Sequence, residues 1–221
     1  VDPLSKYPEK AYKTYFYSKN GRKFHPLSGK KIECLAAKEW EERKFLRFVC
    51  ISDTHNRLHK IVDKIPNGDV LIHGGDFTLS GSLAEIQNFN CDIGKLPHKH
   101  KLVIAGNHGL SLFLSRITKK IILEKSKLLV EWILKIYGSP WQPEYHNWAF
   151  NVQRGKPLLD IWDKIPVDTD VLVTHGPPLG HGDYTINNAR AGCVDLLNTI
   201  EKRVKPRFHV FGHIHEGYGV S

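Results

Sequence analysis

Five short apolar runs, each ending directly in a polar cluster, restrict the fold of this sequence more than any other feature. The runs are rich in β-branched and aromatic residues, which is typical of buried strands. They cover residues 46–52, 69–75, 101–106, 170–176 and 207–213. The clusters read SDTH at 52–55, GGD at 74–76, GNH at 106–108, THGPP at 174–178 and GHIH at 212–215.

Two segments between these runs are expected to form helices. In residues 82–96, apolar side chains recur at Leu83, Ile86, Phe89 and Ile93, a spacing that suits an amphipathic helix. Residues 189–204 are also expected to be helical. The alternation of strands and helices predicts an α/β fold.

The polar clusters contain seven candidate metal ligands. Ligands of α/β proteins gather beyond the carboxyl ends of the strands, so the five clusters are expected to meet at one edge. Histidines, carboxylates and one amide, without a thiolate, suit Mn²⁺, Fe²⁺ or Zn²⁺. The seven candidates are Asp53, His55, Asp76, Asn107, His175, His213 and His215.

The number of candidate ligands favours two ions over one. Seven ligands are too many for a single tetrahedral ion, whereas two ions that share one carboxylate fit the count. Asp76 is the expected bridge, because the two glycines before it permit a close approach of the backbone. Two ions roughly 3.5–4 Å apart can hold a hydroxide between them for in-line attack at phosphorus. We assign no role to the isolated histidines, which are His73, His98, His100 and His209.

Composition sets weaker limits on partners and location. The 221 residues suit one domain, and the net charge of +9 favours anionic partners. A basic nucleic-acid-binding module is another candidate function, but the sequence contains no known nucleic-acid-binding motif. Four cysteines without paired spacing indicate a reducing compartment, and we expect a cytoplasmic location. Charges interrupt the longest apolar stretch, 121–137, so neither a signal peptide nor a membrane span is expected.

Two segments lack a clear pattern. Residues 1–43 are interpreted as a mostly irregular basic leader, with a short helix near 36–43 as an option, and residues 44–221 as the domain itself. Apolar residues between 114 and 132 are roughly helical in spacing, with lysines between them. A cationic helix packed on the sheet is favoured there over a membrane-surface helix.

The five motifs, in this order, resemble those of the calcineurin-like metallophosphoesterase superfamily. RFVCISDTH, VIAGNH, THGPPLG and HVFGHIHEGYG are similar to its MPPED branch, the metallophosphoesterase domain-containing proteins. The resemblance implies a four-layer sandwich of two β-sheets flanked by helices. It also implies a Mn²⁺-activated phosphodiesterase that acts on cyclic nucleotides or artificial diesters.

The resemblance further implies a division of the ligands between two ions and a role for His108. Asp76 serves both ions, and His108 is the general acid that protonates the leaving group, a task suited to a histidine near neutral pH. The first ion takes Asp53, His55, Asp76 and His215. The second takes Asp76, Asn107, His175 and His213.

Three departures from the family pattern keep an alternative open. Gly109 stands where the family usually has an acidic residue, and segment 110–137 is short and matches poorly. The branch continues past EGYG into further strands, so the domain is expected to be truncated at its C-terminus. The alternative function is a nucleotide-binding protein with weakened or lost catalysis. The expected partner is a small phosphodiester or nucleotide rather than nucleic acid, and the sequence does not indicate an oligomeric state.

Overall fold

The computed structural model describes residues 1–14, 46–109 and 134–220, which form an α/β fold. Its strands are β1 (Phe48–Ile51), β2 (Val70–His73), β3 (His100–Val103), β4 (Ile136–Ser139), β5 (Gln142–Pro143), β6 (Asn151–Val152), β7 (Val171–Thr174) and β8 (Phe208–Val210). Its α-helices are α1 (Pro8–Tyr12), α3 (Leu83–Gly94), α6 (Lys156–Trp162) and α7 (Val194–Asn198). Short 3₁₀ and π turns are η2 (Leu58–Lys60), η3 (Val62–Lys64), η4 (Thr199–Val204) and η5 (His215–Gly217).

Two three-stranded parallel sheets form the centre of the molecule. The first has the order β1-β2-β3 and the second β4-β7-β8, while β5 and β6 form a separate pair. Phe48 pairs with Val70 in the first sheet, and Ile136 pairs with Val171 in the second. Because the strands within each sheet are parallel, their polar carboxyl-terminal clusters leave each sheet at one edge.

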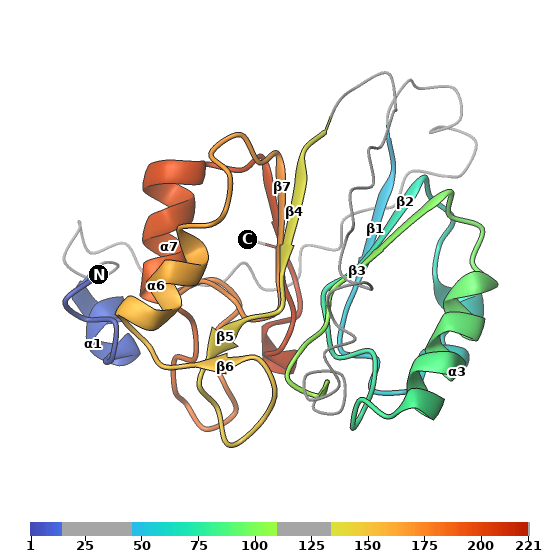
Figure 1. The fold of residues 1–221 in the computed structure, drawn as a ribbon, viewed down its shortest axis with the longest axis horizontal. Helices are drawn as coiled ribbons and strands as arrows, with labels where there is room; N and C mark the ends of the chain where they lie inside the picture. Colours follow the sequence, from blue (N-terminus) through green and yellow to red (C-terminus); the bar gives the residue numbers. More distant parts are fainter. Residues whose placement is uncertain (15–45, 110–133, 221) are drawn as a thin grey trace.

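Apolar clusters pack on both faces of each sheet. Between the sheets lies a cluster that includes Val70 and Ile72 from β2 and Val171 and Val173 from β7. The helices cover the outer faces, with α3 against the first sheet and α6 and α7 against the second (Figure 1). Strands that are buried on both faces read as continuous apolar runs, which explains the runs in the sequence.

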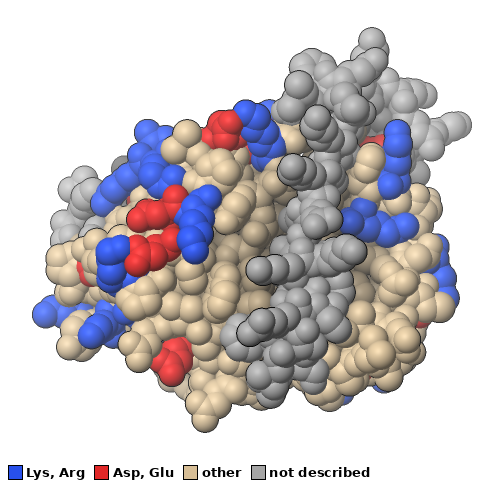
Figure 2. Space-filling model, viewed as in Figure 1, with Lys and Arg blue, Asp and Glu red and all other residues tan. Residues whose placement is uncertain are grey.

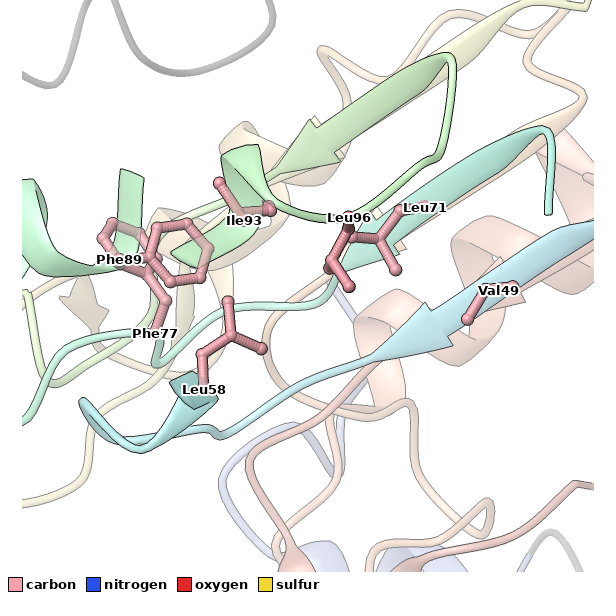
Figure 3. Close-up of a cluster of buried hydrophobic side chains, with 7 residues drawn as sticks. All are labelled: Val49, Leu58, Leu71, Phe77, Phe89, Ile93 and Leu96. Carbon is pink, nitrogen blue, oxygen red and sulfur yellow. The ribbon is translucent and has the colours of Figure 1, made fainter. Parts of the chain in front are cut away.

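Helix α3 begins at a capping box and packs on the first sheet through its apolar side. The Ser82 hydroxyl accepts a hydrogen bond from the Glu85 backbone N–H, and the Glu85 carboxylate accepts one from the Ser82 N–H. Phe89 and Ile93 point into the cluster drawn in Figure 3. Leu83, which was expected on the apolar face, is 64% exposed because it lies at the first position of the helix, beyond the area that the sheet covers.

The amino-terminal edges of the two sheets are fastened in the same way. The Asp69 carboxylate, before β2, accepts the backbone N–H of Arg47, before β1, at 2.7 Å. The Asp170 carboxylate, before β7, accepts the backbone N–H of Lys135, before β4, at 2.9 Å. We call these two contacts the aspartate clasps.

The first fourteen residues, part of the segment interpreted as an irregular leader, include a helix that packs on the domain. Ala11 of α1 is fully buried in a cluster with Leu179 and Leu197. The backbone N–H of Asp2 donates to the Asp195 carboxylate at 2.8 Å. The option of a helix at 36–43 lies outside the described residues, as does nearly all of segment 110–137.

Two further findings bear on location. Cys50, Cys91 and Cys193, the cysteines in the described part of the chain, are free thiols. Within the same ranges, no helix combines the length and the apolar character that crossing a membrane requires.

Candidate metal centre

The polar residues after the strands have backbone conformations that most side chains avoid. Asp53, His55, Asp76 and His213 have φ angles of 55°, 41°, 51° and 72°. Left-handed backbone at residues other than glycine is uncommon, costs free energy and concentrates at functional sites. The chain thus keeps strained conformations at four of the residues that the sequence singles out.

Two glycines let the first sheet come close to His175. Gly75 has a φ of 107°, and a Cβ atom there would overlap Nδ1 of His175. A Cβ atom at Gly106 would overlap Oδ1 of Asp76 and Cε1 of His175. Both positions therefore require glycine for steric reasons.

A buried group of ligand atoms consists of Asp76, His175 and His213, with Asn107 beside it; we call it the buried group. The ligand atoms of the first three lie within 4.8 Å of one another. Nε2 of His175 lies 3.3 Å from Oδ2 of Asp76 and 2.8 Å from Oδ1 of Asn107. Nδ1 of the same ring lies 3.0 Å from the Gly74 carbonyl oxygen. A proton on Nδ1 donated to that carbonyl leaves Nε2 facing the group, as in many metal-binding histidines.

A second group, which we call the open group, consists of Asp53, His55 and His215. Its ligand atoms also lie within 4.8 Å of one another. Nε2 of His55 is 3.2 Å from Nε2 of His215, which in turn is 3.6 Å from Oδ1 of Asp53. The His213 backbone N–H lies 3.1 and 3.0 Å from the two Asp53 carboxylate oxygens and so fixes this carboxylate. The His215 side chain is 61% exposed.

The two groups are linked through a third set of atoms. The ligand atoms of His55, Asp76 and His108 also lie within 4.8 Å of one another. This third set shares His55 with the open group and Asp76 with the buried group. The structure therefore brings all seven candidates from the sequence to one region. These are Asp53, His55, Asp76, Asn107, His175, His213 and His215.

The ionisation of the buried group favours a positive charge next to Asp76. Burial raises the pKa of Asp76, but the charge and hydrogen bond of His175 and the backbone N–H of His108 outweigh it and bring the pKa to about 2. Burial lowers the pKa of His175, but attraction to Asp76 reverses this and raises it above its ordinary value. Burial and the repulsion of His175 lower the pKa of His213 to about 3. The carboxylate is thus ionised, and it holds a cation close to it.

These observations fit divalent ions better than they fit protons alone. A carboxylate that is 3% exposed needs a neighbouring positive charge, and Asp76, His175 and His213 could hold a metal ion that would supply it. Two ring nitrogens of the open group face each other at 3.2 Å, as two ligands of one ion do. The neutral, low-pKa His213 is in the state that a metal ligand requires.

His108 lies at the rim of the two groups and is held from several sides. Its Nδ1 lies 2.7 Å from the Leu79 carbonyl oxygen, and its Nε2 lies 4.0 Å from Oδ2 of Asp76. The Trp148 ring lies against it with the centroids 4.2 Å apart, and the His55 ring meets it edge-on at 4.6 Å. A proton on Nδ1 donated to Leu79 leaves Nε2 directed toward the candidate centre.

Sequence reasoning missed the groups that orient these histidines. The Gly74 and Leu79 carbonyls have no side-chain signature, so no motif identifies them. Trp148 and Tyr145, which contact His108 and His213, come from the segment between β5 and β6. Their aromatic character in an exposed segment was the only available signal.

Comparison with known proteins gives the family. The model of the family described as calcineurin-like phosphoesterase matches residues 46–217. The chain belongs to this family. Two relatives agree: a UPF0046 protein of Caenorhabditis elegans is 44% identical over 245 residues, and human metallophosphoesterase domain-containing protein 1 is 42% identical over 250 residues. These alignments cover 100% of this chain and 84% and 75% of the two relatives.

The family prediction made from the five motifs is therefore confirmed. Calcineurin-like phosphoesterases are metal-dependent, and the general class assigned to this chain is that of a metal-dependent phosphoester hydrolase. Its candidate ligands lie where the parallel strands of the two sheets end, as the α/β pattern predicted.

Proposed function

We propose that the protein is a dinuclear phosphodiesterase that hydrolyses small phosphodiesters, including cyclic nucleotides. The observation that carries this proposal is the overlap of the buried and open groups through Asp76 and His55, with His108 beside both. Two bound ions, with Mn²⁺ favoured over Fe²⁺ and Zn²⁺, would supply the nucleophile and neutralise charge on the phosphate. The open group would hold one ion, and the buried group with Asn107 the other.

The residues of the chain have separate tasks in this proposal. Asp76 joins the two halves and keeps its negative charge, since its pKa is about 2. In this proposal His108 acts as the imidazolium: it donates Nδ1–H to the Leu79 carbonyl oxygen at 2.7 Å and passes the Nε2 proton to the leaving oxygen. General-acid transfer of this kind typically contributes about 10²–10⁴-fold to the rate.

The contacts of His108 can compensate for the glycine at position 109. The residue after His108 is Gly109, which has no carboxylate. The Leu79 carbonyl instead contacts Nδ1 of His108 and can fix its tautomer. Trp148 shields the other side of the ring. These contacts favour retained catalysis over the alternative, a nucleotide-binding protein with weakened or lost catalysis.

The rim of the site supports a small aromatic substrate. Tyr145 is 54% exposed and Trp148 37% exposed, and both rings contact histidines of the centre. A nucleobase can stack on such rings. On the face drawn in Figure 2, basic and acidic side chains are interspersed over the left part, whereas the charged side chains on the right are mostly basic.

Hydrolysis of bis(p-nitrophenyl) phosphate in the presence of Mn²⁺ tests the proposal. Wild type should turn over many times, whereas Asp76→Asn and His108→Ala should lose activity. Asp92→Asn is the matched control, because Asp92 of α3 is also a buried carboxylate but pairs with Lys95, just after the helix. Inert wild type with each of the three metals, together with tight AMP or GMP binding, would support the alternative function instead.

The assignment of ligands to two ions has a test of its own. His213 belongs to the buried group and His215 to the open group, although one residue separates them. His213→Gly and His215→Gly should each lose a different ion, which metal analysis at limiting Mn²⁺ can measure. Unchanged stoichiometry in both variants contradicts the assignment.

Two further expectations complete the proposal. We assign the fold to the four-layer sandwich, which the order α3, first sheet, second sheet, then α6 and α7 supports (Figure 1). A cytoplasmic location is supported by the free thiols of Cys50, Cys91 and Cys193. Cell fractionation tests the location, and an experimental structure with bound metal tests the fold.

A further inference from the structure

We propose that Glu85 is a positioning residue for His108, acting through the segment 79–82. The role rests on the proposed function of His108 as general acid. Glu85 lies in the first turn of α3, and its carboxylate accepts hydrogen bonds from residues 79–82. Its carboxylate organises a loop whose Leu79 carbonyl accepts the hydrogen bond that orients the His108 ring.

The Glu85 carboxylate gathers almost every donor of this loop. Oε1 accepts the Leu79 N–H at 3.1 Å, and Oε2 accepts the N–H groups of Ser80 and Ser82, both at 3.0 Å. The hydroxyls of Ser80 and Ser82 donate to Oε2 at 2.8 and 3.2 Å. One buried side chain therefore fixes the path of residues 79–82.

Ordinary helix capping does not account for this arrangement. A capping box needs only the bond from Glu85 to the N–H of the N-cap residue, Ser82. The bonds to Leu79 and Ser80 lie further back along the chain and add nothing to the helix end. These bonds fix Leu79, whose carbonyl oxygen accepts the hydrogen bond from the His108 ring.

The other end of the loop is fixed at His108 itself. The Leu79 peptide donates its N–H to Glu85 and presents its C=O to Nδ1 of His108 at 2.7 Å. The Thr78 hydroxyl donates to the His108 backbone carbonyl at 3.1 Å. The contacts thus run from Glu85 through residues 78–79 to both the backbone and the ring of His108.

Helix α3 is a firm base for these contacts. Phe89 of α3 packs on Phe77 with the ring centroids 4.4 Å apart, and both belong to the cluster in Figure 3. Phe77 follows Asp76 directly, so the packing ties α3 to the candidate centre. Burial raises the pKa of Glu85, but hydrogen bonds from Ser80, Ser82 and Leu79 outweigh it and lower the pKa to about 2, so the carboxylate is ionised.

A double-mutant cycle between Glu85 and His108 tests the coupling. Glu85→Gln replaces an acceptor oxygen by an NH₂ group that faces N–H donors, so the loop must shift. We expect kcat for a diester with a poor, alkoxide leaving group to fall about 10–100-fold, the range seen when an orienting partner of a site is removed. The KM and the bound metal should stay unchanged, and an activated p-nitrophenyl diester should be affected far less.

The decisive comparison is made in the His108→Ala background. If Glu85 acts through His108, Glu85→Gln should cause no further loss there. Equal losses in both backgrounds, or full activity of Glu85→Gln, overturn the proposal while leaving the proposed function intact. Asp92→Asn, at the other end of α3, is the control for general weakening of the helix.

A second measurement does not require turnover and is made on variants whose circular dichroism matches that of wild type. Long-range ¹H–¹⁵N spectra of the His108 ring, recorded at a pH where the imidazole is neutral, report which nitrogen carries the proton. Wild type should carry it on Nδ1, and Glu85→Gln should shift the population toward Nε2. Glu85→Asp keeps a carboxylate on a shorter side chain and should give an intermediate spectrum. Identical tautomers in wild type and Glu85→Gln overturn the proposal even if wild type hydrolyses nothing.

Discussion

The buried and open groups of the candidate centre offer similar side chains in opposite surroundings. The His175 side chain is 0% exposed and is fixed by the Gly74 carbonyl, whereas the His215 side chain is 61% exposed. The protein thus buries most of one half of the centre and leaves the other half in contact with solvent. A buried site binds an ion as part of the folded structure, and an open site can exchange ligands with the substrate.

The strongest test of this comparison removes the residue that both halves depend on. Asp76→Asn deletes the charge that offsets His175 and joins the groups. We expect both ions to bind weakly and kcat/KM to fall about 10³-fold or more, which corresponds to roughly 4 kcal/mol of transition-state stabilisation. Steady-state kinetics over a range of Mn²⁺ concentrations measures the loss, and recovery of full activity at high Mn²⁺ would contradict it.

Removing one histidine from each half should separate their contributions to stability. His175→Ala leaves the Asp76 carboxylate buried and unpaired, which should lower the metal-free free energy of unfolding by about 3–5 kcal/mol. His215→Ala changes an exposed side chain and should stay within about 0.5 kcal/mol of wild type. Urea unfolding in a chelator measures both variants. Similar losses would remove the distinction between the two halves.

Acid should destabilise the metal-free protein first through the titration of its buried groups. Burial lowers the pKa of His73, which lies behind the centre, to about 4, so the folded state binds fewer protons than the unfolded state below pH 6.5. Stability is therefore lost as the pH falls from about 6.5 to 4, by roughly 2–3 kcal/mol from this residue. Asp76, with its pKa lowered to about 2, adds a further loss between about pH 4 and 2. A stability profile of wild type against His73→Gln, which cannot titrate, should differ in slope in the first window.

The smallest expected effect concerns the rim of the open half. Trp148→Ala removes the ring that lies 4.2 Å from His108 and should lower kcat about 3–10-fold, since aromatic contacts contribute about 0.5–1.5 kcal/mol. Trp148→Phe, which keeps a ring, is the matched control and should retain most of the activity. Stability should change little, because Trp148 is 37% exposed. Equal kinetics for Ala and Phe would show that the stacking does not act on His108.

Strands β1, β2, β3, β7 and β8 and helices α3 and α7 could be predicted because burial leaves a mark in the sequence, whereas β4, β5 and β6 were not predicted. The run at 69–75 contains β2 (Val70–His73), and the segment 82–96 contains α3 (Leu83–Gly94). Helix α6 was not predicted, since seven residues are too few for a clear period. Its available signal was Pro157 in the first turn, a position that proline favours. The sequence could not reveal that α1 packs on Leu179 and Leu197, because that contact joins distant segments.

The site was predictable in its residues but not in its orientation. Parallel strands bring their carboxyl ends to one edge, so Asp53, Asp76 and Asn107 of the first sheet could be expected together. The meeting of Asp76 with His175, which follows β7 of the second sheet, depends in addition on how the two sheets pack. Which nitrogen of His175 faces inward depends on the Gly74 carbonyl, and the same holds for His108 and Leu79. Backbone groups are chemically alike at every residue, so their roles appear only in three dimensions.

The aspartate clasps mark an end of the molecule that can be altered separately from the candidate centre. They fasten the amino-terminal edges of both sheets through Asp69 and Asp170, at the end remote from the strained residues of the centre. The turn before Asp170 includes Val167, which is 64% exposed. A reporter peptide or an entire foreign domain inserted in this turn should leave the activity unchanged. A sensor could therefore be built by insertion at the end of the molecule remote from the candidate centre.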